Sequence, residues 1–208
     1  MDKNLTQALV EFDEDFVLAD IEQRLAAGEP PMTLVRELQE GMRLVGEHFE
    51  SGRYYLSELM MSADLFTRAM AVLEPHLSGV VMETIGRIVI GTPKGDIHDI
   101  GKNIFCTLAR SAGFEVHDLG VDVPVDRFTE TIGRVQPDVL AFSALLTTTF
   151  ESMKAIVDWM AANGWRERVK VIVGGGVITE TVKTYIGADG WTRDALDGLN
   201  QCRSLVGR

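Results

Sequence analysis

The 208-residue chain has only two cysteines, Cys106 and Cys202, and both fall in segments with helical periodicity. A disulfide is not expected, and each is interpreted as a core or surface thiol. No apolar run approaches the roughly 20 residues that a membrane-spanning helix needs. No apolar segment follows Lys3, as it would in a secretory signal peptide. We therefore expect a cytoplasmic protein without a membrane partner.

Basic residues are scarce beside acidic ones, because 20 Lys and Arg face 31 Asp and Glu and the net charge is −11. A nucleic-acid surface needs clustered Lys and Arg, and the sequence has no such cluster. No nucleic-acid partner is therefore expected. The negative charge favours solubility and is compatible with a basic partner. With 46% hydrophobic residues, the chain is an ordinary globular one, long enough for one large domain or two modest ones.

Up to about Ser78 the periodicity predicts helices only. They cover residues 5–12, 15–27, 30–52 and 54–76. Gly28 and Gly52 end two of them, and Pro30-Pro31 opens another, since proline is tolerated in a first turn. Breaks at Glu74-Pro75 and Ser78-Gly79 mark a linker. A first domain of residues 1–84 follows, with four helices.

From residue 85 to 208 short apolar runs alternate with helical segments. Such alternation is typical of βαβ units and a parallel sheet, and five strands suggest the flavodoxin-like order. Strands are predicted at 87–91, 115–118, 139–143, 169–173 and 187–189. Helices are predicted at 100–112, 125–135, 148–163, 178–185 and 192–205.

One loop after the first strand carries a histidine between two aspartates, in Gly91-Thr-Pro-Lys-Gly-Asp-Ile-His-Asp-Ile-Gly-Lys-Asn103. Asp96 and His98 are two residues apart, so on an extended segment their side chains share a side. A carboxylate that accepts the Nδ1 proton fixes the direction of Nε2. The same pair occurs beside metal-bound histidine and in nucleophilic triads. An isolated pair of this kind is more often part of a plain surface loop.

Neither a zinc site nor a hydrolase is well supported by this loop. His48, His76 and His117 lack a second ligand at zinc-site spacing. No Ser or Cys lies in a nucleophile elbow.

Two further strand ends are polar or glycine-rich. Hydroxyl groups follow the third strand at Ser143, Thr147, Thr148 and Thr149, and Gly174-Gly175-Gly176 follows the fourth. Glycines there let a ligand lie on the backbone, although the run does not match a dinucleotide fingerprint.

The three strand ends together resemble the base-off, His-on cobalamin-binding signature. Asp96-x-His98-x-x-Gly101 is followed by 41 residues (Lys102 to Phe142), then by Ser143-x-Leu145. After 28 more residues (Leu146 to Val173) comes Gly174-Gly175. The helical part is similar to the cap domain of methionine synthase and of small corrinoid proteins of methyltransferase systems. Val45-Gly-Glu-His-Phe-Glu and Tyr55-Leu-Ser-Glu-Leu-Met are close to that cap pattern.

The resemblance implies a cobalamin site in which His98 is the lower axial cobalt ligand. Asp96 would accept its ring proton, and Thr149 stands where the family has a hydroxyl that completes the relay. Ser143 would bond the buried base of the nucleotide tail. The implied cofactor-binding residues are Gly95, Asp96, Ile97, His98, Asp99, Ile100, Gly101, Ser143, Leu145, Thr147, Thr149, Gly174, Gly175, Gly176, Val177, Asp189 and Gly190, with Tyr55, Leu59, Met60 and Leu65 in the cap.

The resemblance further implies a methyl carrier rather than a complete enzyme. Its cofactor would cycle between methylcobalamin and cob(I)alamin, and cob(II)alamin is a third form of the same cofactor. A substrate-specific methyltransferase would supply the methyl group from methanol, a methylamine or a methoxylated aromatic. An O-demethylase system of an anaerobe is the preferred interpretation. A second methyltransferase would pass the group to tetrahydrofolate or coenzyme M, and a reductive activase would restore the cofactor.

Two other functions are compatible with the same motif. An adenosylcobalamin-dependent light-sensing regulator would share the cap and the signature. It would carry a cap tryptophan ten residues before a Glu-His pair, and here Glu37 stands ten residues before Glu47-His48. A cobalamin subunit of a mutase is disfavoured, because such subunits usually lack this helical cap.

Overall fold

The computed structural model describes residues 3–77 and 84–207. The chain divides into two compact units, residues 1–83, here the cap unit, and residues 84–208, here the sheet unit. The boundary expected after residue 84 differs from this division by one residue. The predicted break at Ser78-Gly79 lies outside the described residues.

The cap unit consists of helices, as expected. They are α1 (Leu5–Val10), α2 (Glu14–Ala26), α3 (Pro31–Glu50), α4 (Leu56–Leu73) and the short 3₁₀ helix η1 (Glu74–Leu77). Side chains cap the amino ends of two of these helices. The carboxylate of Asp13 accepts from Phe16 N at the start of α2, and Glu58 accepts from Tyr55 N at the start of α4. Such caps satisfy N–H groups that the first helical turn leaves without a partner.

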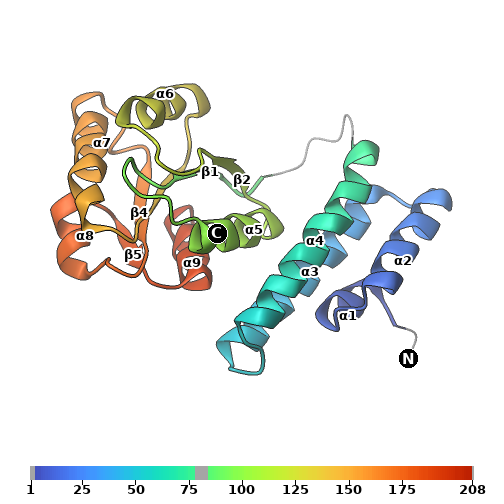
Figure 1. Ribbon diagram of the computed structural model, residues 1–208. Coiled ribbons are helices and arrows are strands. Elements are labelled where there is room, and N and C mark those ends of the chain that lie inside the picture. Colours follow the sequence, from blue (N-terminus) through green and yellow to red (C-terminus); the bar gives the residue numbers. More distant parts are fainter. Residues whose placement is uncertain (1–2, 78–83, 208) are drawn as a thin grey trace. The chain divides into compact units, whose positions relative to one another are not determined.

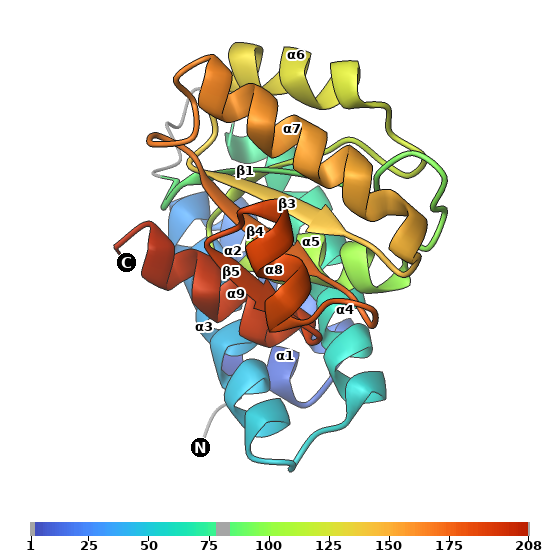
Figure 2. The ribbon, with the colours of Figure 1, turned by 90° about the vertical axis from the view of Figure 1, so that its left-hand side faces the viewer.

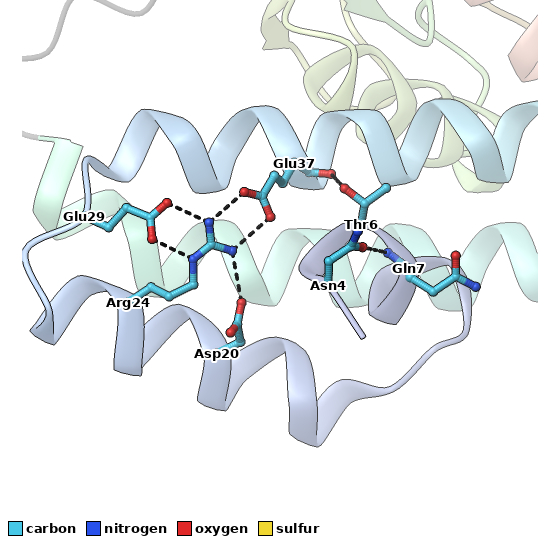
Figure 3. Close-up of polar contacts among 7 residues, drawn as sticks. All are labelled: Asn4, Thr6, Gln7, Asp20, Arg24, Glu29 and Glu37. Carbon is cyan, nitrogen blue, oxygen red and sulfur yellow. Dashed lines mark hydrogen bonds and ion pairs between the residues drawn. The ribbon is translucent and has the colours of Figure 1, made fainter. Parts of the chain in front are cut away.

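Polar contacts join the helices of the cap unit to one another (Figure 3). The guanidinium of Arg24 on α2 binds Glu37 on α3 at 2.6 Å and Glu29 in the α2–α3 loop at 2.7 Å. It also binds Asp20 one turn earlier on α2 at 3.1 Å. The Thr6 hydroxyl donates to the Glu37 carbonyl and so ties α1 to α3. Arg24 therefore fixes the α2–α3 hairpin and neutralises part of the local negative charge.

The sheet unit is a doubly wound α/β domain with parallel strands in the order β2-β1-β3-β4-β5. The strands are β1 (Arg87–Gly91), β2 (Glu115–Asp118), β3 (Val139–Ser143), β4 (Lys170–Gly174) and β5 (Gly190–Thr192). The helices are α5 (Ile100–Ser111), α6 (Val125–Val135), α7 (Phe150–Ala162), α8 (Glu180–Ile186) and α9 (Ala195–Leu205), with the 3₁₀ helix η2 (Thr147–Thr149) before α7. This is the flavodoxin-like order, and the predicted fold class is confirmed.

Helices cover both faces of this sheet (Figures 1 and 2). On one face α6, α7 and α8 pack over Val89, Leu140 and Val171. On the other face α5 packs against α9. The central strands are therefore buried on both sides, which explains why Ile88-Val89-Ile90 reads as a continuous apolar run.

The fifth strand lies three residues later than predicted, at Gly190–Thr192 instead of 187–189. Gly187 ends α8 in the left-handed region, with φ +83°, so residues 187–189 turn out of the helix rather than pair. The sequence Gly-Ala-Asp-Gly gives no apolar alternation that would have located the strand. Among the described residues no helix is long and apolar enough to cross a membrane.

Candidate functional site

Asp96 and His98 lie in the loop between β1 and α5, at the carboxyl edge of the sheet. The loop leaves β1 at Gly91 and enters α5 at Ile100. The Nδ1 of His98 is 2.7 Å from Asp96 Oδ1, and the backbone N–H of His98 donates to the same oxygen at 3.0 Å. Because a carboxylate only accepts, Nδ1 carries a ring proton, and in the neutral imidazole Nε2 then carries the lone pair. About half of the His98 side chain is exposed, so Nε2 is accessible to a ligand.

The carboxylate of Asp96 is fully buried and is held from two strand ends. Its Oδ2 accepts from Leu145 N at 2.7 Å and Leu146 N at 3.1 Å, in the loop after β3. Burial opposes ionisation, but the N–H groups of Leu145, His98 and Leu146 and the His98 ring outweigh it. The pKa of Asp96 is therefore lowered. Asp96 is thus the ionised acceptor that orients His98 and joins two loops.

The expected hydroxyl relay through Thr149 is not formed in this structure. The Thr149 side chain is buried, and its hydroxyl donates to the Leu146 carbonyl at 2.7 Å. A hydroxyl has one proton to donate, so this bond directs it away from Asp96. The backbone N–H groups of Leu145 and Leu146 take the place expected for the hydroxyl. No side-chain pattern signals backbone donors, and Thr149 was expected here only from the family resemblance.

Exposed apolar side chains occur in the histidine loop and in the loop after β3 that binds Asp96. Ile97 and Ile100 are 72% and 70% exposed, and Leu145 and Leu146 are about two-fifths exposed. Large apolar side chains gathered this way at one sheet edge mark a surface that a ligand or partner covers. Of these residues, Ile97, Ile100 and Leu145 were predicted at the site, whereas Leu146 was not.

A pocket opens beside this surface, between the sheet and the helices α5 and α9. Predicted residues among its lining are Gly101, Ser143, Gly174 and Gly175. The sequence did not identify its remaining walls, which are Ile90, Lys102, Phe105, Ala141, Phe142, Ile172, Thr192, Arg193, Asp194 and Ala195. Ile90 pairs with Ala141, and Ala141 pairs with Ile172, so these three side chains lie on the same face of the sheet.

The glycines of this pocket serve different purposes. A Cβ on Gly101 would meet nothing within 4 Å, and on Gly174 it would make only ordinary contacts. These two positions leave room for a ligand. Gly175 instead has φ +133°, and a Cβ there would lie 1.9 Å from the carbonyl oxygen of Ala144. Gly175 is therefore required by the close approach of the two loops themselves.

Several predicted residues lie away from this pocket. Gly190 begins β5 and Asp189 directly precedes it, at the amino end of the strand, where Asp189 Oδ2 accepts from Val171 N at 2.7 Å and binds Arg166. They face the opposite edge of the sheet, because the fifth strand was placed too early. Thr147 and Gly176 are exposed outside the pocket lining, and Val177 packs against the core on the α6–α7 face.

The predicted cap residues divide in two. Tyr55 and Met60 are 72% and 46% exposed, as a ligand-covering role requires. Leu59 and Leu65 are almost fully buried, although they too were predicted to bind the cofactor. Leu56 and Met61, which were not predicted, are exposed instead. Because α4 is apolar on more than one face, its periodicity did not distinguish the core side from the open side.

Next to the pocket lies an ion pair, Lys102–Asp118, in which the lysine is buried and the aspartate is partly exposed. The Lys102 ammonium is 2.5 Å from Asp118 Oδ2 and also donates to Asn103 Oδ1. Burial opposes ionisation of Asp118, but Lys102 and the Gly120 N–H outweigh it and lower its pKa. Burial, together with the Asp118 charge, raises the pKa of the nearby Cys106 thiol to about 12. Both cysteines are free and buried, so neither is a reactive thiolate.

Changing Lys102 to Met is expected to lower the stability of the sheet unit by roughly 1 kcal/mol at pH 7, because the Asp118 carboxylate loses its partner but keeps some contact with water. The double change Lys102→Met with Asp118→Asn should restore most of that loss. Since the folded pKa of Asp118 is lowered, its stabilisation is present above the unfolded value near pH 4 and is lost as the pH falls through the folded value. The Asp118→Asn variant should therefore lose less stability on acidification.

Urea unfolding followed by tryptophan fluorescence measures these effects, because Trp159, Trp165 and Trp191 all lie in the sheet unit. An unchanged midpoint in the Lys102→Met variant would show that the ion pair does not stabilise the fold.

Two family models match this chain. The B12 binding domain model covers residues 86–200, and a second model, also described as B12 binding domain, covers residues 1–74. The first spans the sheet unit with both loops of the site, and the second spans the cap unit.

Relatives match over nearly the whole chain. Dimethylamine corrinoid protein 2 of Methanosarcina acetivorans is 38% identical over 205 residues, which cover 98% of this chain and 95% of the relative. A solved cobalamin-binding protein from Desulfitobacterium hafniense is 36% identical, with a TM-score of 0.76 and coverage of 98% and 97%. The methanol:cobalamin methyltransferase complex of Methanosarcina barkeri contains a chain that is 30% identical, with a TM-score of 0.87 and coverage of 98% and 79%.

The signature loops agree with these matches, and so does the presence of both a cap unit and a sheet unit. Cobalamin is the cofactor that both family models describe. The chain therefore belongs to the B12-binding corrinoid proteins of methyltransferase systems.

Proposed function

We propose that this protein carries a methyl group on cobalamin that is bound with His98 as the lower axial ligand of cobalt. The Asp96–His98 pair supports this assignment most directly. Its geometry leaves Nε2 with a lone pair in a fixed direction, in a loop with exposed apolar side chains. An aspartate that binds the far nitrogen of a metal-bound histidine fixes its tautomer and raises its basicity.

The residues present fit a cobalamin. Ile97, Ile100, Leu145 and Leu146 offer an apolar surface around His98 for the flat corrin ring. The neighbouring pocket has open space at Gly101 and Gly174 for the nucleotide tail, and Ser143 supplies a hydroxyl in its wall. When bound, cobalamin supplies a cobalt that accepts a methyl group and gives it away. The protein contributes the axial nitrogen, an acceptor for its proton and a slot that holds the tail.

The proposed partners are a substrate-specific methyltransferase, a second methyltransferase that uses tetrahydrofolate or coenzyme M, and a reductive activase. A chain similar to this protein occurs in a complex named for methanol:cobalamin methyltransferase. Relatives named for dimethylamine share 38% of their residues with it. We therefore propose a methylated amine as the methyl donor and methanol as the second candidate. A methoxylated aromatic donor, which the sequence analysis preferred, stays a prediction.

Cobalamin-loaded, reduced protein should be methylated about tenfold faster with dimethylamine and a dimethylamine:corrinoid methyltransferase than with methanol and its methyltransferase. The visible spectrum of the bound cofactor follows the reaction. Free cobalamin at the same concentration is the control. Equal rates for free and protein-bound cofactor would contradict the carrier function, whereas faster methylation from methanol or a methoxylated aromatic would correct only the donor.

The light-sensing alternative receives no further support. Its expected cap tryptophan is replaced by Glu37, whose carboxylate is bound by Arg24 on α2.

A further inference from the structure

The loop that carries His98 is held by backbone hydrogen bonds to the loop between β2 and α6. Residues 92–96 and 120–123 run side by side beyond the ends of their strands. Thr92 N donates to Gly120 O and Val123 N donates to Thr92 O, both at 3.0 Å. Lys94 N donates to Val123 O at 2.9 Å. The histidine loop is therefore held from the β2 side as well as from the β3 side, where Asp96 binds Leu145 and Leu146.

Among the contacts between these two segments, those of Asp122 involve the residues nearest to His98 in the sequence. Its backbone N–H donates to the Asp96 carbonyl at 3.0 Å, and its Oδ1 accepts from Gly95 N at 2.7 Å. One residue thus binds two consecutive positions of the histidine loop. Asp122 itself has φ +53°, a left-handed conformation that is uncommon for any residue but glycine and least unfavourable for Asn and Asp. Gly95 has φ +92°, so the contact joins two unusual backbone positions.

We infer that Asp122 is a positioning residue for His98. Its carboxylate holds the Gly95 amide, and its left-handed backbone aims the N–H at the Asp96 carbonyl. Because the Asp96 carboxylate in turn fixes the His98 ring, a shift of the Gly95–Asp96 segment changes the direction of Nε2. Asp122 is exposed and does not line the pocket, so its effect reaches the cofactor through this segment. This inference rests on the proposed role of His98.

Three substitutions separate the carboxylate from the backbone. Asp122→Asn keeps an oxygen acceptor and tolerates the left-handed conformation. Asp122→Gly keeps the conformation but removes the acceptor. Asp122→Ala removes the acceptor and adds backbone strain. In the full-length protein without cofactor, hydrogen exchange of the Gly95 amide should be about fivefold faster in the Gly and Ala variants, and unchanged in the Asn variant.

The same variants are then loaded with cobalamin, and the electron paramagnetic resonance of the cob(II)alamin form is recorded. The signal from an axial nitrogen should fall several-fold in the Gly and Ala variants and be restored in the Asn variant. Cobalamin affinity should change by less than about threefold in all of them, because the tail slot is intact. A merely structural role would lower the melting temperature without changing the nitrogen signal.

Unchanged Gly95 exchange in the Gly and Ala variants would overturn the inference, and so would an intact nitrogen signal despite faster exchange. A normal Gly variant beside an impaired Ala variant would also overturn it, since the carboxylate would then be dispensable. If the wild-type protein itself shows no axial histidine nitrogen, the proposed function fails, and with it the role inferred for Asp122 toward cobalt. The Gly95 exchange rates then still show whether Asp122 holds the loop.

Discussion

Replacing Gly175 with alanine is expected to destabilise the sheet unit by roughly 3–5 kcal/mol, a loss near the upper end for single substitutions. The new Cβ would lie 1.9 Å from the carbonyl oxygen of Ala144 and 2.8 Å from its carbonyl carbon. Both are backbone atoms and cannot rotate away. The backbone at Gly175 also has φ +133°, which alanine rarely adopts. Steric overlap and backbone strain therefore add at one position.

The flanking glycines provide matched controls. At Gly174 the nearest atom to a new Cβ is Thr192 Cγ2 at 3.5 Å, an ordinary contact. At Gly176 it is the end of the flexible Leu145 side chain, at 3.1 Å. Each alanine there should change stability by less than about 1 kcal/mol. Urea unfolding followed by tryptophan fluorescence compares the three variants, and equal losses at all three positions would contradict the structural explanation.

The glycine run illustrates what sequence can and cannot predict. Three consecutive glycines after a strand predicted that a ligand can lie directly on the backbone, and Gly174 and Gly175 do line the pocket. The run did not show which glycine is required by the fold. That distinction depends on the distance between the ends of β3 and β4, which come from segments about 30 residues apart in the sequence.

A histidine-to-alanine change at position 98 is expected to abolish axial ligation while leaving most cobalamin binding intact. The variant loses the nitrogen donor, but the pocket beside α5 and α9 is unaltered. The dissociation constant for cobalamin should therefore rise by only about tenfold. The visible spectrum should change to that of a cofactor without an axial nitrogen. Exogenous imidazole should restore the original spectrum, since it fits the space that the side chain leaves.

His117 provides the control for this change. It also has a carboxylate two residues earlier, and Glu115 Oε1 lies 2.7 Å from His117 Nε2. That pair lies on the edge strand β2, whereas the pocket is lined by residues of β1, β3, β4 and β5. Changing His117 to Ala should leave the spectrum unchanged. A spectral change in both variants, or in neither, would show that the ligand assignment is wrong.

The order of the sheet and the clustering of the signature at its carboxyl edge followed from strand–helix alternation, because parallel strands end on the same side. Asp96 and His98 were placed correctly beside each other, since they are close in sequence. The relay expected at Thr149 is not formed in this structure, where the Thr149 hydroxyl donates to the Leu146 carbonyl and the backbone N–H groups of Leu145 and Leu146 bind Asp96. The contacts of Asp122 with the histidine loop were not predicted, because they depend on a left-handed backbone conformation at a residue other than glycine.

The central claim, that His98 is the protein's cobalt ligand, is tested most directly by isotope labelling. The protein is produced with nitrogen-15 histidine and loaded with cobalamin, and the electron paramagnetic resonance of its cob(II)alamin form is recorded. An axial nitrogen-14 splits each cobalt line into a triplet, whereas nitrogen-15 gives a doublet. We predict a triplet in unlabelled protein, a doublet after histidine labelling and neither in the His98→Ala variant. A triplet that persists after labelling would show that the cofactor's own base, and not His98, binds the cobalt.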